Sequence, residues 1–123
     1  MIWFQVFMAA FMILIPAVML GFGYFWKRKP PNKVNSAYGY RTKRSMSSRA
    51  AWAYAHEVCA RIWRYFGAFL LGLTLILIVL MFILCRTVDE VGYLGSIVVF
   101  IQIIPLIAAI PITEHALKKK FGF

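Results

Sequence analysis

Three long apolar segments, separated by polar segments, run along the chain. They cover residues 2–26, 66–85 and 91–113, and none of them contains a charged side chain. A helix of roughly 20 residues crosses a hydrocarbon core of about 30 Å. The pattern therefore predicts an all-α integral membrane protein with three transmembrane helices, in a single membrane domain that covers residues 1–123.

The composition supports the same class. Hydrophobic residues make up 63% of the chain, against about 45–50% in soluble globular domains. Three apolar segments of this length would find no interior large enough to bury them in a protein of this size. The composition therefore excludes a soluble domain.

Basic residues are concentrated in two of the polar segments. The chain has 14 Lys and Arg against 4 Asp and Glu, and most of the positive charge lies in the segment 27–65 and in the tail 114–123. The turn 86–90 has a single Arg and two acidic residues. By the positive-inside rule, the loop 27–47 and the C-terminus are cytoplasmic, and the N-terminus and the turn face outward. Because topology accounts for the charge, nucleic-acid binding is not needed to explain it.

The polar segment before the second span divides into a loop and a helix. Proline disfavours the α region in the residue that precedes it, so the segment Lys29-Pro30-Pro31-Asn32 stops the first helix, and the basic loop extends to residue 47. Serines that can cap a helix precede the segment 48–65, in which apolar residues recur at helical spacing. The sequence leaves open whether this is an amphipathic helix on the membrane surface or a cytoplasmic extension of the second span.

The sequence predicts no metal and no cofactor. Cys59 and Cys85 would lie about 39 Å apart along one helix, whereas a disulfide needs Cα atoms within about 7 Å. Metal-ligand spacings of Cys and His are absent from the sequence, and so are the glycine-rich phosphate loops.

The most residue-specific part of the chain follows the first span. It reads Asn35-x-x-x-Gly39-Tyr40-Arg41-Thr42-x-x-Ser45-Met46, followed by Trp52 and by Ala55-His56. This pattern resembles the signature of the SdpI family of small bacterial membrane proteins, and the ending from Thr113 to Phe121 resembles the C-terminal pattern of that family. The resemblance implies a multi-pass protein of the bacterial cell membrane.

The resemblance also implies partners. The founding family member protects its producing cell against a secreted membrane-active toxin and sequesters a transcriptional repressor at the membrane. The partners expected for this chain are therefore membrane lipids and, by this resemblance, a toxin peptide or a regulatory protein. That protein has further spans before the motif, whereas this chain has one.

The motif and the C-terminal pattern together predict a polar cluster for ligand binding or for structure. Arg41 carries a planar guanidinium suited to bidentate recognition of a carboxylate or phosphate. It could bind a lipid phosphate, or it could pair with Glu114 and tie the loop to the third span. Pro16 and Pro105 could splay the spans and open a cavity roofed by Arg41 and Glu114. The predicted cluster contains Asn35, Tyr38, Gly39, Tyr40, Arg41, Thr42, Arg44, Ser45, Trp52, His56, Glu114 and His115.

The sequence leaves three functions open. The leading one is an SdpI-like immunity or envelope-stress protein that is not an enzyme and that binds an anionic lipid headgroup, a peptide or a protein through its loop, in signalling or protection. The second is a small oligomeric channel or transporter, although no span carries an ionisable residue of the kind that marks ion pathways. The third is a membrane-embedded enzyme that uses His56 or Glu114. Small residues four apart, Ala17 with Gly21 and Ala68 with Gly72, leave a homo-oligomer open.

Overall fold

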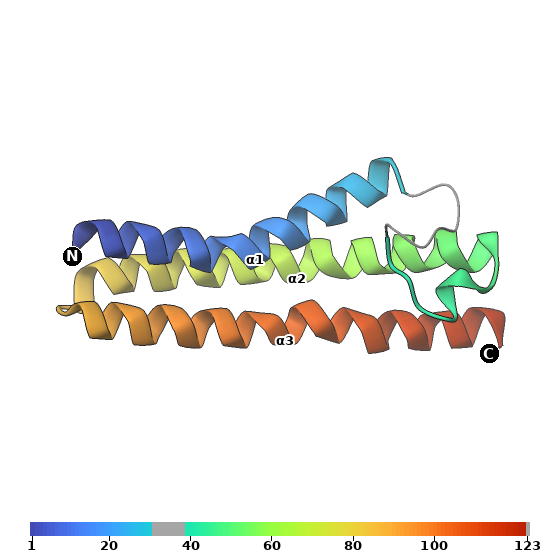
Figure 1. Cartoon of the computed structure of the whole chain (residues 1–123). Coiled ribbons are helices and arrows are strands. Elements are labelled where there is room, and N and C mark those ends of the chain that lie inside the picture. The colour runs from blue at the N-terminus through green and yellow to red at the C-terminus, as the bar shows by residue number, and fades with distance from the viewer. Residues whose placement is uncertain (31–38, 123) are drawn as a thin grey trace.

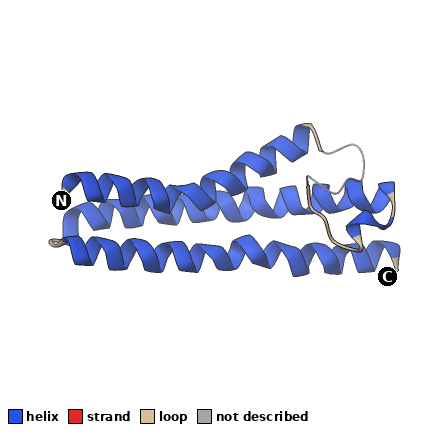
Figure 2. Cartoon of the chain, viewed as in Figure 1, coloured by secondary structure: helices blue, strands red, loops and turns tan. Residues whose placement is uncertain are grey.

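The computed structural model describes residues 1–30 and 39–122. In this part of the chain it contains α1 (Ile2–Arg28), the short 3-10 helix η1 (Ser45–Ser47), α2 (Arg49–Leu84) and α3 (Val88–Phe121). The three long helices lie side by side in an elongated bundle, with α2 antiparallel to α1 and α3 (Figure 1). Helices and their connections account for all of the described residues (Figure 2).

All three long helices are long and apolar enough to cross a membrane. The chain is therefore all-helical with three candidate spans, as the apolar pattern predicts. At 1.5 Å per residue, the 36 residues of α2 and the 34 residues of α3 reach about 50 Å, well beyond a hydrocarbon core of about 30 Å. One end of each helix must therefore project from the apolar layer.

The helix α2 is continuous through the segment 48–65 and the second apolar segment. Its first turn is capped by Ser48, whose hydroxyl oxygen accepts a hydrogen bond of 3.0 Å from the amide of Ala51. Thr87 caps α3 in the same way, because its hydroxyl oxygen accepts from the amide of Glu90 at 3.2 Å. Gly122, with φ of 74°, ends α3 in the left-handed conformation.

The first helix changes direction at its proline. Pro16 has no amide hydrogen for the carbonyl of Met12, and Gln102 of α3 supplies one instead, with its side-chain amide 2.9 Å from that carbonyl oxygen. The same amide nitrogen donates to the hydroxyl of Thr74 on α2 at 2.8 Å. Figure 1 shows α1 bending away from α3 over its second half. One buried glutamine thus joins all three helices where the bend begins.

Close packing of α1 on α2 depends on glycines. A Cβ at Gly67 would lie 3.2 Å from the backbone nitrogen of Leu20, and a Cβ at Gly23 would lie 3.0 Å from the carbonyl oxygen of Ala60. By contrast, a Cβ at Gly21 or Gly72 would meet no atom within 4 Å. These two glycines, which belong to the small-residue pairs of the sequence, are therefore not used for packing within the chain.

The apolar core forms two clusters, one toward each end of the bundle. The cluster near the N-terminus joins Met12, Met81, Val91 and Val98. The cluster at the opposite end joins side chains of all three helices to a side chain from the connecting loop, Tyr40. The loop is therefore packed into the helix bundle, and the candidate site lies at this end.

Candidate functional site

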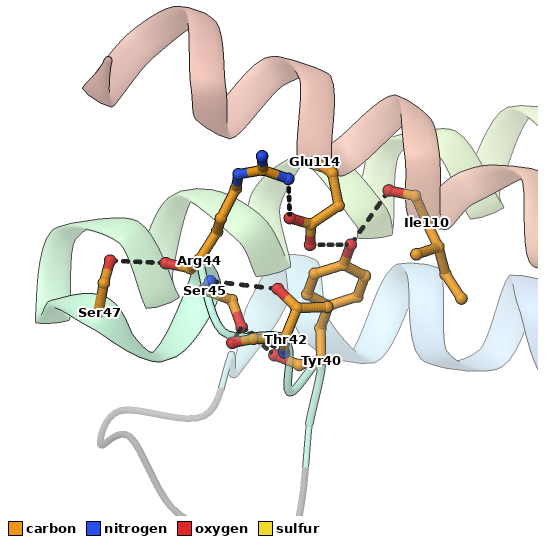
Figure 3. Close-up of polar contacts among 7 residues, drawn as sticks. All are labelled: Tyr40, Thr42, Arg44, Ser45, Ser47, Ile110 and Glu114. Atoms are coloured by element: carbon orange, nitrogen blue, oxygen red, sulfur yellow. Dashed lines mark hydrogen bonds and ion pairs between the residues drawn. The ribbon is translucent and has the colours of Figure 1, made fainter. Parts of the chain in front are cut away.

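Tyr40 anchors the loop between the helices. Its side chain is buried, and its hydroxyl donates to Oε1 of Glu114 at 2.8 Å and lies 3.1 Å from the carbonyl oxygen of Ile110 (Figure 3). Burial, reinforced by the hydrogen bond and the negative charge of Glu114, raises the pKa of the Tyr40 phenol above its usual value. Tyr40 therefore remains a protonated hydrogen-bond donor at physiological pH.

Glu114 forms its ion pair with Arg44. The Nη1 atom of Arg44 lies 3.2 Å from Oε2 of Glu114 (Figure 3). Arg44 therefore takes the place at Glu114 for which the sequence offers Arg41 as one alternative. Both partners are accessible to some degree, with 41% of the Arg44 side chain and 17% of the Glu114 side chain exposed. Solvent screens such a pair, so it orients the loop more than it stabilises the fold.

A compact turn explains why Arg44 reaches α3. The amide of Thr42 donates to the hydroxyl of Ser45 at 2.8 Å, and the amide of Ser45 donates to the hydroxyl of Thr42 at 3.2 Å. Ser45 is fully buried, and its hydroxyl lies 2.9 Å from the carbonyl oxygen of Tyr40. These reciprocal bonds require the Thr42-x-x-Ser45 spacing of the motif, and with Tyr40 inserted they direct Arg44 toward Glu114 (Figure 3).

His56, on α2, holds the loop by a hydrogen bond to its backbone. The backbone amide of Tyr40 donates to Nε2 of His56 at 2.8 Å, and Nδ1 of His56 lies 2.8 Å from the carbonyl oxygen of Trp52. Because a carbonyl only accepts, Nδ1 carries the proton and the ring is neutral. The ring is completely buried, with centroids 4.4 Å from Trp52 and 4.8 Å from Trp26. Both ring nitrogens are thus occupied in holding the loop.

The other predicted site residues have separate positions. Thr42 belongs to the turn, Trp52 is buried beneath Gly39 and beside His56, and His115 is exposed on α3. Asn35 and Tyr38 lie outside the described residues. The structure therefore brings together Gly39, Tyr40, Thr42, Arg44, Ser45, Trp52, His56 and Glu114.

A crevice of about 390 Å³ lies beside this cluster. Arg41 is exposed and lines it, and among the described lining residues it is the charged one. The rings of Trp26 and Trp63 stack in its wall with centroids 5.5 Å apart. We call this space the crevice; it is lined by Trp26, Gly39, Tyr40, Arg41, Thr42, Cys59, Trp63, Leu106, Ile107, Ala109 and Ile110.

A second hollow, of about 500 Å³, is lined by Lys43, Arg44, Ser47 and Glu114. The cavity predicted from the prolines would have been roofed by Arg41 and Glu114 together. In the structure Arg41 lines the crevice and Glu114 lines the second hollow, and Tyr40, which lines the crevice, is hydrogen-bonded to Glu114.

Sequence reasoning missed several lining residues of the crevice. Trp26 and Trp63 lie near span ends, where aromatic residues usually act as interfacial anchors. Their positions at the ends of two consecutive spans, on either side of the loop, are a signal that they could meet. Among the described residues, no group of three or more His, Cys, Asp or Glu side chains could hold a metal ion.

The motif and most of the chain match a known protein family. A model of the SdpI/YfhL protein family matches residues 32–113, which include the motif and the α3 residues that line the crevice. The uncharacterized protein YfhL of Bacillus subtilis (strain 168) is 33% identical over 103 residues, which cover 84% of this chain and 78% of that protein. No solved structure matches the chain.

Proposed function

The chain belongs to the SdpI/YfhL protein family, and from this we propose that it is an immunity or envelope-stress protein that binds an anionic group in the crevice. The group would belong to a lipid, a peptide or a protein partner. The observation that carries the proposal is the exposed Arg41 at the edge of an otherwise uncharged, largely apolar crevice.

Arg41 suits this role better than its neighbours in the loop. A guanidinium presents a planar fork of donors that matches a carboxylate or a phosphate. Arg44 and Lys43 both line the second hollow and not the crevice. Tyr40, the residue before Arg41, is held by hydrogen bonds to His56 and Glu114, so the backbone that carries the guanidinium is fixed.

The same contacts favour binding over catalysis. His56 has both ring nitrogens engaged in structural hydrogen bonds, and the phenol of Tyr40 keeps its proton and donates a hydrogen bond to Glu114. A general base needs a free acceptor within reach of a substrate proton. By the positive-inside rule the crevice faces the cytoplasm, so the proposed receptor acts on ligands at the inner membrane surface.

Charge-preserving substitution of Arg41 tests the proposal. We expect Arg41→Lys to impair protection nearly as much as Arg41→Ala, because an ammonium keeps the charge and loses the planar fork. The loss should be roughly tenfold or more, as for a charge-assisted hydrogen bond of about 1.5–3 kcal/mol. The measurement is the survival of cells that express matched amounts of each variant during challenge with a secreted membrane-active peptide toxin.

Lysines of the C-terminal tail provide the matched control. Lys118→Ala and Lys119→Ala remove the same charge from exposed positions on α3, where each contributes only diffuse attraction of about 1 kcal/mol to an anionic surface. Both should have a much smaller effect than either change at Arg41. Survival that follows total positive charge, whichever residue is changed, would replace the specific site with a nonspecific electrostatic role.

A further inference from the structure

The walls of the crevice are more apolar than a site for a small soluble anion requires. Below Arg41 the lining consists mainly of aromatic and aliphatic side chains from all three helices. Inorganic phosphate or a free carboxylate would gain nothing from these walls, because burial of apolar surface contributes only when the ligand has apolar surface of its own. The lining therefore fits a ligand with a charged head and an apolar body.

The crevice is continuous with the lipid-facing surface of the bundle. Ile107 and Ile110 line the crevice, and they are also 54% and 45% exposed on the outside of α3. At this end of the bundle the second half of α1 has turned away from α3 (Figure 1). A ligand can therefore enter sideways from the bilayer without crossing the loop.

The bend that shapes this entrance is built into the fold. Gln102 satisfies the carbonyl of Met12 that Pro16 leaves without a partner, at 2.9 Å, and the glutamine side chain is itself buried. A polar group buried in an apolar layer is costly unless it is paired. This contact therefore stabilises the bent form of α1, and with it the separation of α1 from α3 at the crevice.

We propose that the crevice binds one anionic phospholipid, with the phosphodiester on Arg41 and the first part of an acyl chain along Trp63 and Ile107. The inference rests on the proposed function, because it names the ligand class of the same site. The stacked Trp26 and Trp63 rings suit the boundary between headgroup and chain, where tryptophan concentrates in membranes. A volume of about 390 Å³ holds only the part of the lipid near the headgroup, so the rest of the lipid stays in the bilayer.

Binding of short-chain lipids to the purified chain tests the inference. The probes are phosphatidylglycerol and phosphatidylcholine with two hexanoyl chains each, and glycerol phosphate as the headgroup fragment. Native mass spectrometry from a neutral detergent counts the bound molecules. We expect one retained phosphatidylglycerol and weaker binding of both other probes. Glycerol phosphate lacks the acyl chains, of which each buried methylene contributes about 0.8 kcal/mol, and phosphatidylcholine carries a trimethylammonium group whose positive charge is repelled by Arg41.

Substitutions on α3 separate the crevice from ordinary lipid contact. Ile107→Trp should fill the crevice and weaken phosphatidylglycerol binding, and Arg41→Ala should weaken it by at least roughly tenfold. Ile97→Trp is the matched control, because Ile97 is 56% exposed on the same helix and does not line the crevice. Ile107 has similar exposure, so both variants should fold, and their circular dichroism and thermal midpoints confirm this before binding is compared.

Each outcome has a distinct meaning. Equal binding of glycerol phosphate and phosphatidylglycerol, or of phosphatidylcholine and phosphatidylglycerol, would overturn the lipid inference. So would an equal effect of Ile107→Trp and Ile97→Trp. If Arg41→Ala abolishes protection of cells but not lipid binding, the proposed function stands and the lipid inference fails. If it abolishes lipid binding and leaves protection intact, the lipid site stands and the proposed role in immunity fails.

Discussion

Replacing Gly39 with alanine is expected to be among the most damaging changes of a single methyl group in this chain. Gly39 has φ of 109°, and a Cβ there would lie 2.6 Å from Nε2 of His56 and 3.1 Å from ring atoms of Trp52. Residues other than glycine are strained at such φ by about 1–3 kcal/mol, and overpacking costs about 1–3 kcal/mol more. We expect a loss of roughly 2–6 kcal/mol, together with the loss of ligand binding.

The clash cannot be relieved cheaply. His56 is completely buried and holds the amide of Tyr40 and the carbonyl of Trp52 at the same time. Moving the ring away from a new methyl group would leave the backbone amide of Tyr40 without its partner, at a cost of about 1–3 kcal/mol. The loop would therefore separate from the bundle and carry Arg41 with it.

The measurement is the thermal midpoint of the purified protein in detergent. Gly21→Ala and Gly72→Ala are the matched controls, because a Cβ at either position meets no atom within 4 Å. In a helix interior these changes should stabilise the chain by about 0.5–1 kcal/mol. An equal and small effect of all three substitutions would show that Gly39 and His56 do not pack as described.

Removal of Glu114 should have the next largest effect. Its carboxylate accepts hydrogen bonds from Tyr40 and Arg44, so Glu114→Ala loses two contacts between the loop and α3, and we expect a loss of about 1–3 kcal/mol. Arg44→Ala should cost less than about 1 kcal/mol, because the pair is partly exposed and screened by solvent.

A double-mutant cycle checks this assignment. Thermal stabilities of Arg44→Ala, Glu114→Ala and the double variant should show a coupling of about 0.5 kcal/mol or more, as expected for residues in contact. The same cycle with Arg41→Ala is the control, and it should be closer to additive. Stronger coupling of Glu114 to Arg41 than to Arg44 would contradict the observed ion pair.

The spans could be predicted from sequence because a membrane helix depends mainly on length and hydrophobicity. The continuity of α2 could not. No proline or glycine interrupts residues 49–65, so both a surface helix and an extension of the span agreed with the pattern. The extension is held by contacts far apart in sequence, such as His56 with Tyr40 and Arg64 with the carbonyl oxygen of Gly23, 3.0 Å apart.

The choice between Arg41 and Arg44 was also beyond the sequence. Both arginines lie in the loop that the predicted topology brings to the same end of the bundle as Glu114, and Arg41 belongs to the more specific part of the motif. Which of them reaches α3 depends on the insertion of Tyr40 and on the turn closed by Thr42 and Ser45. These contacts become visible only when the loop is folded on the helices, so residue type and spacing could identify the cluster but not its pairing.

The most direct test of the crevice as a lipid site is photo-crosslinking in the cell membrane. An aliphatic residue that carries a diazirine and is close to isoleucine in size, placed at position 107, should capture phospholipid with an anionic headgroup, and Arg41→Ala in the same chain should remove most of that product. The same group at position 97 should capture bulk lipid without regard to Arg41. If both positions yield the same lipids and neither depends on Arg41, the crevice is ordinary lipid-facing surface and the proposed site is contradicted.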